Sequence, residues 1–230
     1  MTGSQGFVAS APVHTTPVAN GVLMADAILA LAALRASGAT TIPDLPLATY
    51  GSVWRCTAMA WIGPRVHFGS INTVSALRSP GRPQPIANPP RIGPMSRFRP
   101  SMRQHCELLA VDYVAFAGVG DPAAIRGLLP EIWGVGAQVS HGRGAIGAWT
   151  VEGIEAGDWL GLGRGRDGRV TRMMPTKMAD DLGLDGDGVQ RPVSPPYWDA
   201  AAAVDGVEPA MVDVVAPSWD AALWRLGVRA

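Results

Sequence analysis

The residues best suited to chemistry lie in a short glycine-rich stretch, GVGAQVSHGRG, at residues 134–144. Glycine adopts positive φ at little cost and lets a backbone approach a ligand closely, so such clusters line sites for phosphates and nucleic acids as well as ordinary tight turns. The stretch combines backbone amides with polar side chains. Its candidate RNA-binding residues are Gly134, Gly136, Gln138, Ser140, His141, Gly142, Arg143 and Gly144.

Histidine is the side chain that could make such a loop catalytic. Metal-independent RNA cleavage needs a base near the attacking 2′-hydroxyl and an acid for the leaving oxygen. His141 lies inside the glycine stretch, and His14 is expected within a strand, where it would stack on RNA or serve the structure. The sequence pairs neither with a second titratable group. We therefore expect no catalytic residue, and an endoribonuclease acting through His141 or His14 is the alternative.

A second candidate for contact with a polyanion is a long arginine-rich segment. Residues 45–106 contain no acidic residue and eight arginines, and residues 79–104 contain seven prolines. Guanidinium groups bind phosphates bidentately and stack on bases, although a GC-rich genome also favours arginine. We interpret the segment as a basic arm that orders on nucleic acid, with a disordered linker as the alternative. The candidate residues in it are Arg78, Arg82, Arg91, Arg97, Arg99 and Arg103.

The formal net charge of zero conceals a segregation of charge along the chain. Residues 178–230 contain nine acidic residues and three arginines, opposite in balance to the arginine-rich segment. This arrangement is typical of a molecule with one face that meets a polyanion and another that does not.

Several other classes of site lack their signatures. The two cysteines, Cys56 and Cys106, are far apart and have no CxxC or Cys/His spacing, so neither a disulfide framework nor a zinc site is indicated. A phosphate-binding Walker loop would need Gly-Lys-Ser/Thr, and a dinucleotide fingerprint would lie between a strand and a helix rather than between a helix and a strand. We expect no metal and no cofactor.

The elements that must position these residues alternate between strand and helix. Valine-rich and aromatic runs predict strands at residues 7–18, 52–62, 106–120 and 145–155. Apolar spacing predicts a helix within residues 20–38 that Gly38 ends, and Asp121 followed by Pro122 predicts the start of another. The order is that of an α+β, ferredoxin-like (RRM-like) βαββαβ core, whose open sheet face commonly binds RNA.

The domain organisation follows from this order. We expect one domain at residues 1–180, interrupted by an insertion at about 63–104, and an acidic extension at 181–230 that packs on the core or on a neighbour. Within the extension, residues 193–215 are expected to be weakly structured, and residues 217–227 to form a terminal helix.

The glycine stretch and its surroundings resemble a known family. GVGAQVSHGRG is similar to the glycine-rich loop of the RAMP superfamily of CRISPR-associated proteins, in which Gly-apolar-Gly, five variable residues and Gly-x-Gly recur after the second helix of a ferredoxin-like fold. The flanking residues resemble most closely the small backbone subunit of type IV CRISPR effector complexes. The resemblance covers roughly residues 7–180, and its motif-level part is the loop. The family's usual lysine or arginine is missing from the insert AQVSH.

The resemblance implies a function. It implies a crRNA-binding subunit that caps the 5′ handle of the guide, with the loop glycines against the handle, Arg143 beside its phosphates and the arginine-rich insertion as a thumb-like extension. Its partners would be crRNA and the helical backbone and large subunits of the effector, with target nucleic acid met indirectly. A protein–protein scaffold without RNA contact is a second alternative.

The cellular location that we expect for the protein follows from the absence of recognisable targeting segments. The first residues lack a basic region before an apolar stretch. The most apolar segment, residues 22–36, contains Asp26 and is too short to span a bilayer. We therefore expect a cytoplasmic protein with no membrane contact.

Overall fold

The fold mixes α-helices with several β-sheets. The computed structural model describes residues 5–19, 21–63, 107–108, 110–137, 139–155, 163–165, 167–197, 199–210, 215–226 and 228. Within these ranges there are four α-helices, one five-stranded sheet, one three-stranded sheet and two two-stranded sheets. None of the helices formed by the described residues is long and apolar enough to cross a membrane.

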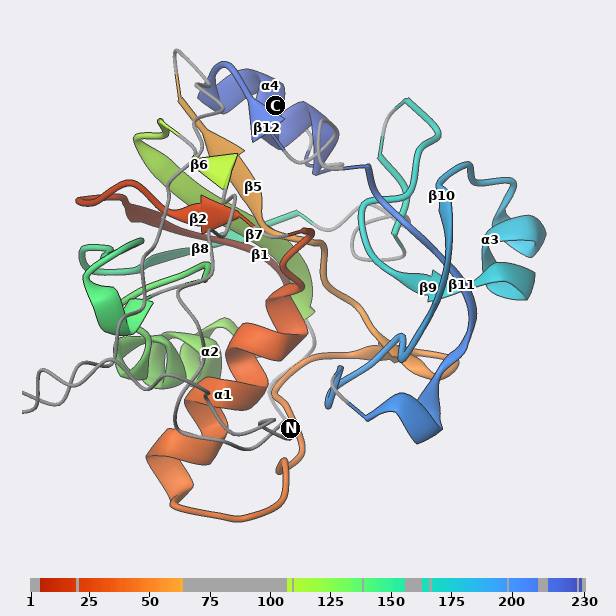
Figure 1. Ribbon diagram of the computed structural model, residues 1–230, viewed down its shortest axis with the longest axis horizontal. Helices are drawn as coiled ribbons and strands as arrows, with labels where there is room; N and C mark the ends of the chain where they lie inside the picture. Colours follow the sequence, from red (N-terminus) through yellow and green to blue (C-terminus); the bar gives the residue numbers. More distant parts are fainter. Residues whose placement is uncertain are drawn as a thin grey trace, which may run out of the picture.

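The largest sheet has the order β12-β5-β7-β1-β8 (Figure 1). Its neighbours pair antiparallel, except that β12 runs parallel to β5. β1 and β7 pair along their whole length, from Gln5 opposite Gly120 to Pro12 opposite Tyr113. The strands are β1 (Gln5–Pro12), β5 (Ala60–Ile62), β7 (Tyr113–Gly120), β8 (Thr150–Ile154) and β12 (Val215–Ala216).

Alternate residues of each strand point to opposite sides of this sheet. Apolar side chains pack on both of its faces. Phe7 of β1 and Phe116 of β7 belong to a core shared with α1 (Ala25–Ser37) and α2 (Pro122–Leu128). We call this side the first face. Val8 and Ala115 point to the other side, the second face, where they pack with residues of α4 (Trp219–Arg225). Figure 1 shows α1 and α2 on one side of the sheet and α4 on the other.

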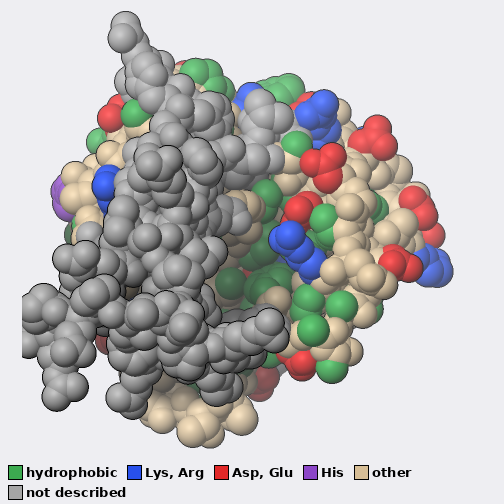
Figure 2. All heavy atoms as spheres, viewed as in Figure 1, with side chains coloured by type: hydrophobic (Ala, Val, Ile, Leu, Met, Phe, Trp, Pro, Cys, Tyr) green, Lys and Arg blue, Asp and Glu red, His purple; other side chains and the backbone are tan. Residues whose placement is uncertain are grey.

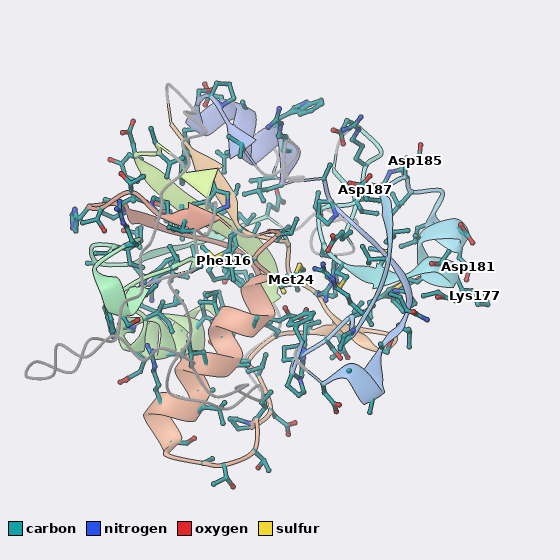
Figure 3. All side chains as sticks on the ribbon, in the orientation of Figure 1. Met24, Phe116, Lys177, Asp181, Asp185 and Asp187 are labelled. Atoms are coloured by element: carbon teal, nitrogen blue, oxygen red, sulfur yellow. The ribbon has the colours of Figure 1, made fainter. Side chains whose placement is uncertain are left out.

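On the first face, α1 ends and α2 begins where the sequence predicts. Gly38 follows α1 in the left-handed region at φ 66°, and its N–H donates to Leu34 O. The Asp121 carboxylate accepts hydrogen bonds from the first amides of α2, those of Ala123 and Ala124, at 2.9 and 3.2 Å. Met24, which precedes α1, lies with Phe116 in the core between helix and sheet (Figure 3).

The predicted strands are shorter than the sequence runs that indicated them. The run 7–18 ends as a strand at Pro12, so His14 lies beyond β1 rather than within it. The run 52–62 contains two separate strands, β4 (Val53–Trp54), paired with β3 (Thr49–Tyr50), and β5. The run 106–120 is likewise divided between β6 (Glu107–Leu108), which pairs with β2 (Val18–Ala19), and β7.

The acidic C-terminal region is structured, contrary to the prediction for residues 193–215. β11 (Val204–Glu208) is the central strand of a sheet with the order β10-β11-β9, and this sheet lies beside α3 (Figure 1). The other elements of this group, which we call the second unit, are β9 (Met174–Pro175), α3 (Thr176–Leu182), β10 (Asp187–Arg191) and a 3-10 turn at Ala200–Ala202. The chain then returns to the main sheet through β12, and the predicted terminal helix is confirmed as α4.

Candidate nucleic-acid interface

The glycine-rich stretch forms a closed loop between α2 and β8. Its two ends are joined by a bridge between Gly134 and Ala145 and by a hydrogen bond of 2.8 Å from Val135 N to Gly144 O. One 3-10 turn, Val139–His141, lies at its centre. A short 3-10 helix, Leu129–Glu131, connects the loop to the end of α2. The packed sheet and helix therefore fix both ends of the loop.

Two of the loop glycines are required by the protein's own backbone. Gly136 and Gly144 have φ values of 90° and 61°. A Cβ at Gly144 would lie 1.9 Å from Val135 O, and one at Gly136 would lie 2.7 Å from Val18 O. The close approach that glycine permits here is between backbone segments of this chain itself. These two glycines therefore shape the loop and do not admit a ligand.

Gly142 is different. Its φ is also positive, at 78°, but a Cβ there would meet nothing within 4 Å, and the residue is exposed. Among the four glycines, it is therefore the one with open space beside its Cα, although its N–H donates to Val139 O and its carbonyl oxygen accepts from the Thr15 hydroxyl, each at 2.9 Å. Ser140 is exposed beside it, Arg143 follows it and is half-buried, and the backbone of His141 completes the turn.

The segment that follows β1 fastens the loop in place. The Thr15 hydroxyl donates to Gly142 O and accepts from Ala145 N, each at 2.9 Å. His14 N donates to Ala145 O at 2.8 Å, and Gly144 N donates to Thr16 O at 3.4 Å. Thr15 was not among the residues predicted from the sequence. Nothing in the stretch HTTP indicates that this threonine has a partner 127 residues away.

His14 therefore lies beside the loop, although the sequence does not place it there. Its side chain is exposed, and a Cβ at Gly147 would lie 2.8 Å from His14 Nε2. Trp133, directly before the loop, exposes 55% of its surface. An imidazole and an indole are therefore available to stack on bases beside the loop.

β6, which directly follows the arginine-rich segment in the sequence, lies at the same place. Val18 pairs with Leu108 of β6, and Val18 O accepts a hydrogen bond of 2.8 Å from Ala137 N in the glycine loop. Gly63, directly after β5, is the last described residue before β6. The predicted contact residues between these two positions, Arg78, Arg82, Arg91, Arg97, Arg99 and Arg103, lie outside the described residues, as does Gln138.

The loop and the residues directly beside it in sequence contain no carboxylate. Neither residues 132–151 nor residues 5–19 contain an acidic residue, and Arg143 makes no hydrogen bond or ion pair with any residue that the structure describes. Several exposed acidic side chains gather instead on the second unit, at the right in Figure 2. They include Asp180, Asp181, Asp185, Asp187, Asp199 and Asp205.

A buried polar cluster elsewhere has a structural role. Asp26 of α1 and Arg172 are both fully buried, and their nearest charged atoms are 3.2 Å apart. The Tyr197 hydroxyl donates to Asp26 Oδ1 at 2.8 Å, and the Arg172 guanidinium also donates to the carbonyls of Val193, Met173 and Trp54. Because the ions are paired and their donors satisfied, the cluster fixes the second unit to α1.

Burial also decides the chemistry of Cys56 in this cluster. Its desolvation raises the pKa of the thiol well above its usual range, with a further increase from the Asp26 carboxylate. Burial likewise raises the pKa of the Tyr197 phenol. Burial lowers the pKa of Arg172, but the interactions with its neighbours, of which that with Asp26 is the largest, together outweigh this effect and the net shift is upward. Cys56 is therefore a protonated thiol and a poor nucleophile.

The described parts of the chain contain no group of three or more histidine, cysteine, aspartate or glutamate side chains that could hold a metal ion. The structure does bring together residues that the sequence did not single out. Tyr113 and Trp219 line a groove on the second face of the main sheet, together with two carboxylates. Strand alternation along β7 could have indicated the outward position of Tyr113, but nothing in the sequence predicts that Trp219 meets it.

Comparison with known proteins gives no assignment. No protein-family model matches the sequence, and no curated protein matches it at a significant level.

Proposed function

We propose that this chain is a crRNA-binding subunit of a type IV CRISPR ribonucleoprotein that holds the 5′ handle of the guide and contacts the backbone and large subunits. The observation that carries the proposal is a junction centred on Val18. There the glycine loop, the exposed segment after β1 and β6, which directly follows the arginine-rich segment in the sequence, are hydrogen-bonded together.

The topology supports the ferredoxin-like part of the proposal. Without its edge strand β12, the main sheet has the order β5-β7-β1-β8, and all of its pairs are antiparallel. With α1 between β1 and β5 and α2 between β7 and β8, this is the order expected of a βαββαβ core. The glycine loop occupies the connection between α2 and β8, where the resemblance implies that it belongs.

The chemistry of the loop region supports an RNA strand as the ligand. The surface beside Gly142 is open, Arg143 has no partner among the described residues, and His14 and Trp133 are exposed. Guanidinium groups bind phosphates, while aromatic rings stack on unpaired bases. The second face of the sheet supports RNA binding less well, because α4 covers part of it.

The salt dependence of RNA binding tests the proposal. The ligand is an RNA that carries the repeat-derived 5′ handle, compared with a scrambled RNA of equal length and composition. Replacing Arg97, Arg99 and Arg103 together with alanine should weaken binding. It should also reduce the slope of log K against log[salt] by roughly 2, because each phosphate contact with single-stranded RNA contributes about 0.7.

A matched triple variant separates site-specific contacts from net charge. Replacing Lys177 and Arg191 of the second unit, together with Arg169 shortly before it in the chain, with alanine removes the same charge and should leave the slope nearly unchanged. An unchanged slope in the arginine-segment variant, or equal slopes in both variants, would contradict the proposal. Crosslinks from the loop to the handle would support it, and their absence would favour a protein–protein scaffold.

The endoribonuclease alternative has one observation in its favour, the exposed position of His14 beside the loop. Incubation of the purified protein with repeat RNA in EDTA distinguishes the two functions. Defined cleavage that is lost in a His14→Ala or His141→Ala variant would overturn the non-enzymatic proposal, and intact RNA would support it.

A further inference from the structure

A groove on the second face of the main sheet forms a second candidate site, apart from the glycine loop. It has a volume of about 460 Å³, within the range of about 300–1,000 Å³ typical of ligand pockets. It lies where β1, β7 and β8 face the start of α4. Its lining includes Ser10, Asp112, Tyr113, Thr150, Glu152 and Trp219.

Two aromatic rings form one wall of the groove. Tyr113 begins β7 and Trp219 begins α4, and their ring centroids are 6.3 Å apart with planes inclined at 69°. The two side chains remain 47% and 37% exposed despite this contact. Part of each ring is therefore accessible to a ligand, and the electron-rich face of an aromatic ring attracts cations.

Two carboxylates complete the lining. Glu152 of β8 is fixed opposite Val8, and Asp112 is fixed by a hydrogen bond of 2.8 Å from Val13 N to its carbonyl. Both residues are exposed, and neither side chain forms an ion pair with a residue that the structure describes. Ser10 and Thr150, opposite each other on β1 and β8, add two hydroxyls.

Together, these groups select a cation and disfavour a phosphate. We propose that the groove binds an arginine side chain presented by an extended segment of a partner polypeptide. A guanidinium can stack on Tyr113 or Trp219 while it donates to Asp112 or Glu152, and its planar fork suits both contacts better than an ammonium does. The groove is larger than one guanidinium needs, which leaves room for the neighbouring backbone.

This inference goes beyond the RNA-binding function and does not depend on it. The glycine loop would hold nucleic acid, and the groove would hold protein. Their ligands have opposite charge, so each can be tested in the presence of a variant that disables the other. Arg143→Ala in the loop should leave peptide binding unchanged.

The test uses the full-length protein and a fluorescein-labelled peptide, Gly-Ser-Arg-Gly-Arg-Ser-Gly, with fluorescence anisotropy as the measurement. The control peptide has citrulline at both arginines, which preserves shape and removes charge. We expect the citrulline peptide to bind at least tenfold more weakly. The double variant Asp112→Asn with Glu152→Gln, and the single variant Trp219→Ala, should each lose at least tenfold in affinity for the arginine peptide.

A matched charge control is the double variant Asp180→Asn with Glu155→Gln, whose residues lie on α3 and directly after β8. It should bind the arginine peptide as the unaltered protein does. Equal affinity for the two peptides, or equal loss in both double variants, would overturn the proposal. It would also be overturned if oligouridylate bound more tightly than the peptide and that binding required Tyr113 and Trp219, because the groove would then be a nucleobase site.

Discussion

Cys56 illustrates how burial at one residue changes what its side chain can do. The thiol is enclosed with Asp26 and Arg172, and its pKa is raised chiefly by desolvation. The sequence indicates neither a disulfide framework nor a zinc site at this cysteine, and the structure shows that its side chain is fully buried. The neighbouring ion pair was not predictable, because its partners are separated by 146 residues.

The raised pKa of Cys56 predicts that stability falls at alkaline pH. In the unfolded chain the thiol ionises above a pH of about 8.5, whereas in the native state it keeps its proton. The native state then binds one more proton, so the free energy of unfolding should fall by about 1.4 kcal/mol per pH unit as the pH rises above that value.

Urea unfolding between pH 7 and pH 10 measures this effect. A Cys56→Ala variant should be less stable at pH 7, because a buried side chain is lost, but its stability should decline less steeply above pH 8.5. A Tyr197→Phe variant should differ in slope only above about pH 10, where a free phenol ionises. Identical slopes for Cys56→Ala and the unaltered protein would contradict the prediction.

The glycine loop illustrates what the sequence reveals about an element and what it does not. The glycine spacing indicates a tight, ligand-lining loop, and three of the four glycines have positive φ. The sequence does not distinguish glycines that the backbone requires from one that leaves space. That distinction depends on Val18, whose carbonyl approaches from the segment after β1, and on Val135, whose carbonyl approaches from the opposite end of the loop.

Alanine substitutions in the loop should separate these two roles. Gly142→Ala should cost only the strain of a left-handed backbone, about 1 kcal/mol. Gly144→Ala should cost roughly 3 kcal/mol or more, since the added Cβ also meets Val135 O. Thermal or urea unfolding measures both. Equal destabilisation by the two variants would show that the contact with Val135 O does not limit the loop.

Local signals predicted the long elements better than the short strands. The Asp121 cap and the Gly38 terminus define α2 and α1 because a cap acts on its own helix. The run 52–62 has strand composition throughout, but only pairing partners decide where it joins a sheet. β4 pairs with β3 and β5 with β7, and neither partner is visible in a local pattern.

The buried cluster around Asp26 connects the two main parts of the molecule. Asp26 belongs to α1, whereas Arg172, Val193 and Tyr197 belong to the part of the chain that forms or adjoins the second unit. Val193 and Tyr197 are bonded to this cluster, so the start of residues 193–215 is held against α1 and is not weakly structured as the sequence predicts. Strand propensity in residues 193–215 is low, and long-range contacts compensate for it.

Removal of the Asp26 charge should therefore destabilise the whole molecule. Asp26→Asn leaves the Arg172 guanidinium buried without its counter-ion, which should cost about 3–5 kcal/mol in urea unfolding. The double variant Asp26→Leu with Arg172→Met removes both charges and should recover part of this loss.

The exposed substitution Asp180→Asn is the control, and it should leave the unfolding midpoint unchanged. If Asp26→Asn behaved like this control, the ion pair would not hold the second unit in place. If the double variant were as unstable as the sum of its single variants, the two charges would not be coupled.

The position of β12 has a consequence for synthesis of the protein on the ribosome. Residues 215–226 supply the edge strand and the helix that cover Val8 and Ala115 on the second face, and they follow β1 by some 200 residues. While the nascent chain is incomplete, this apolar surface has no cover. The interval before α4 docks is therefore the period in which a chaperone would be needed most.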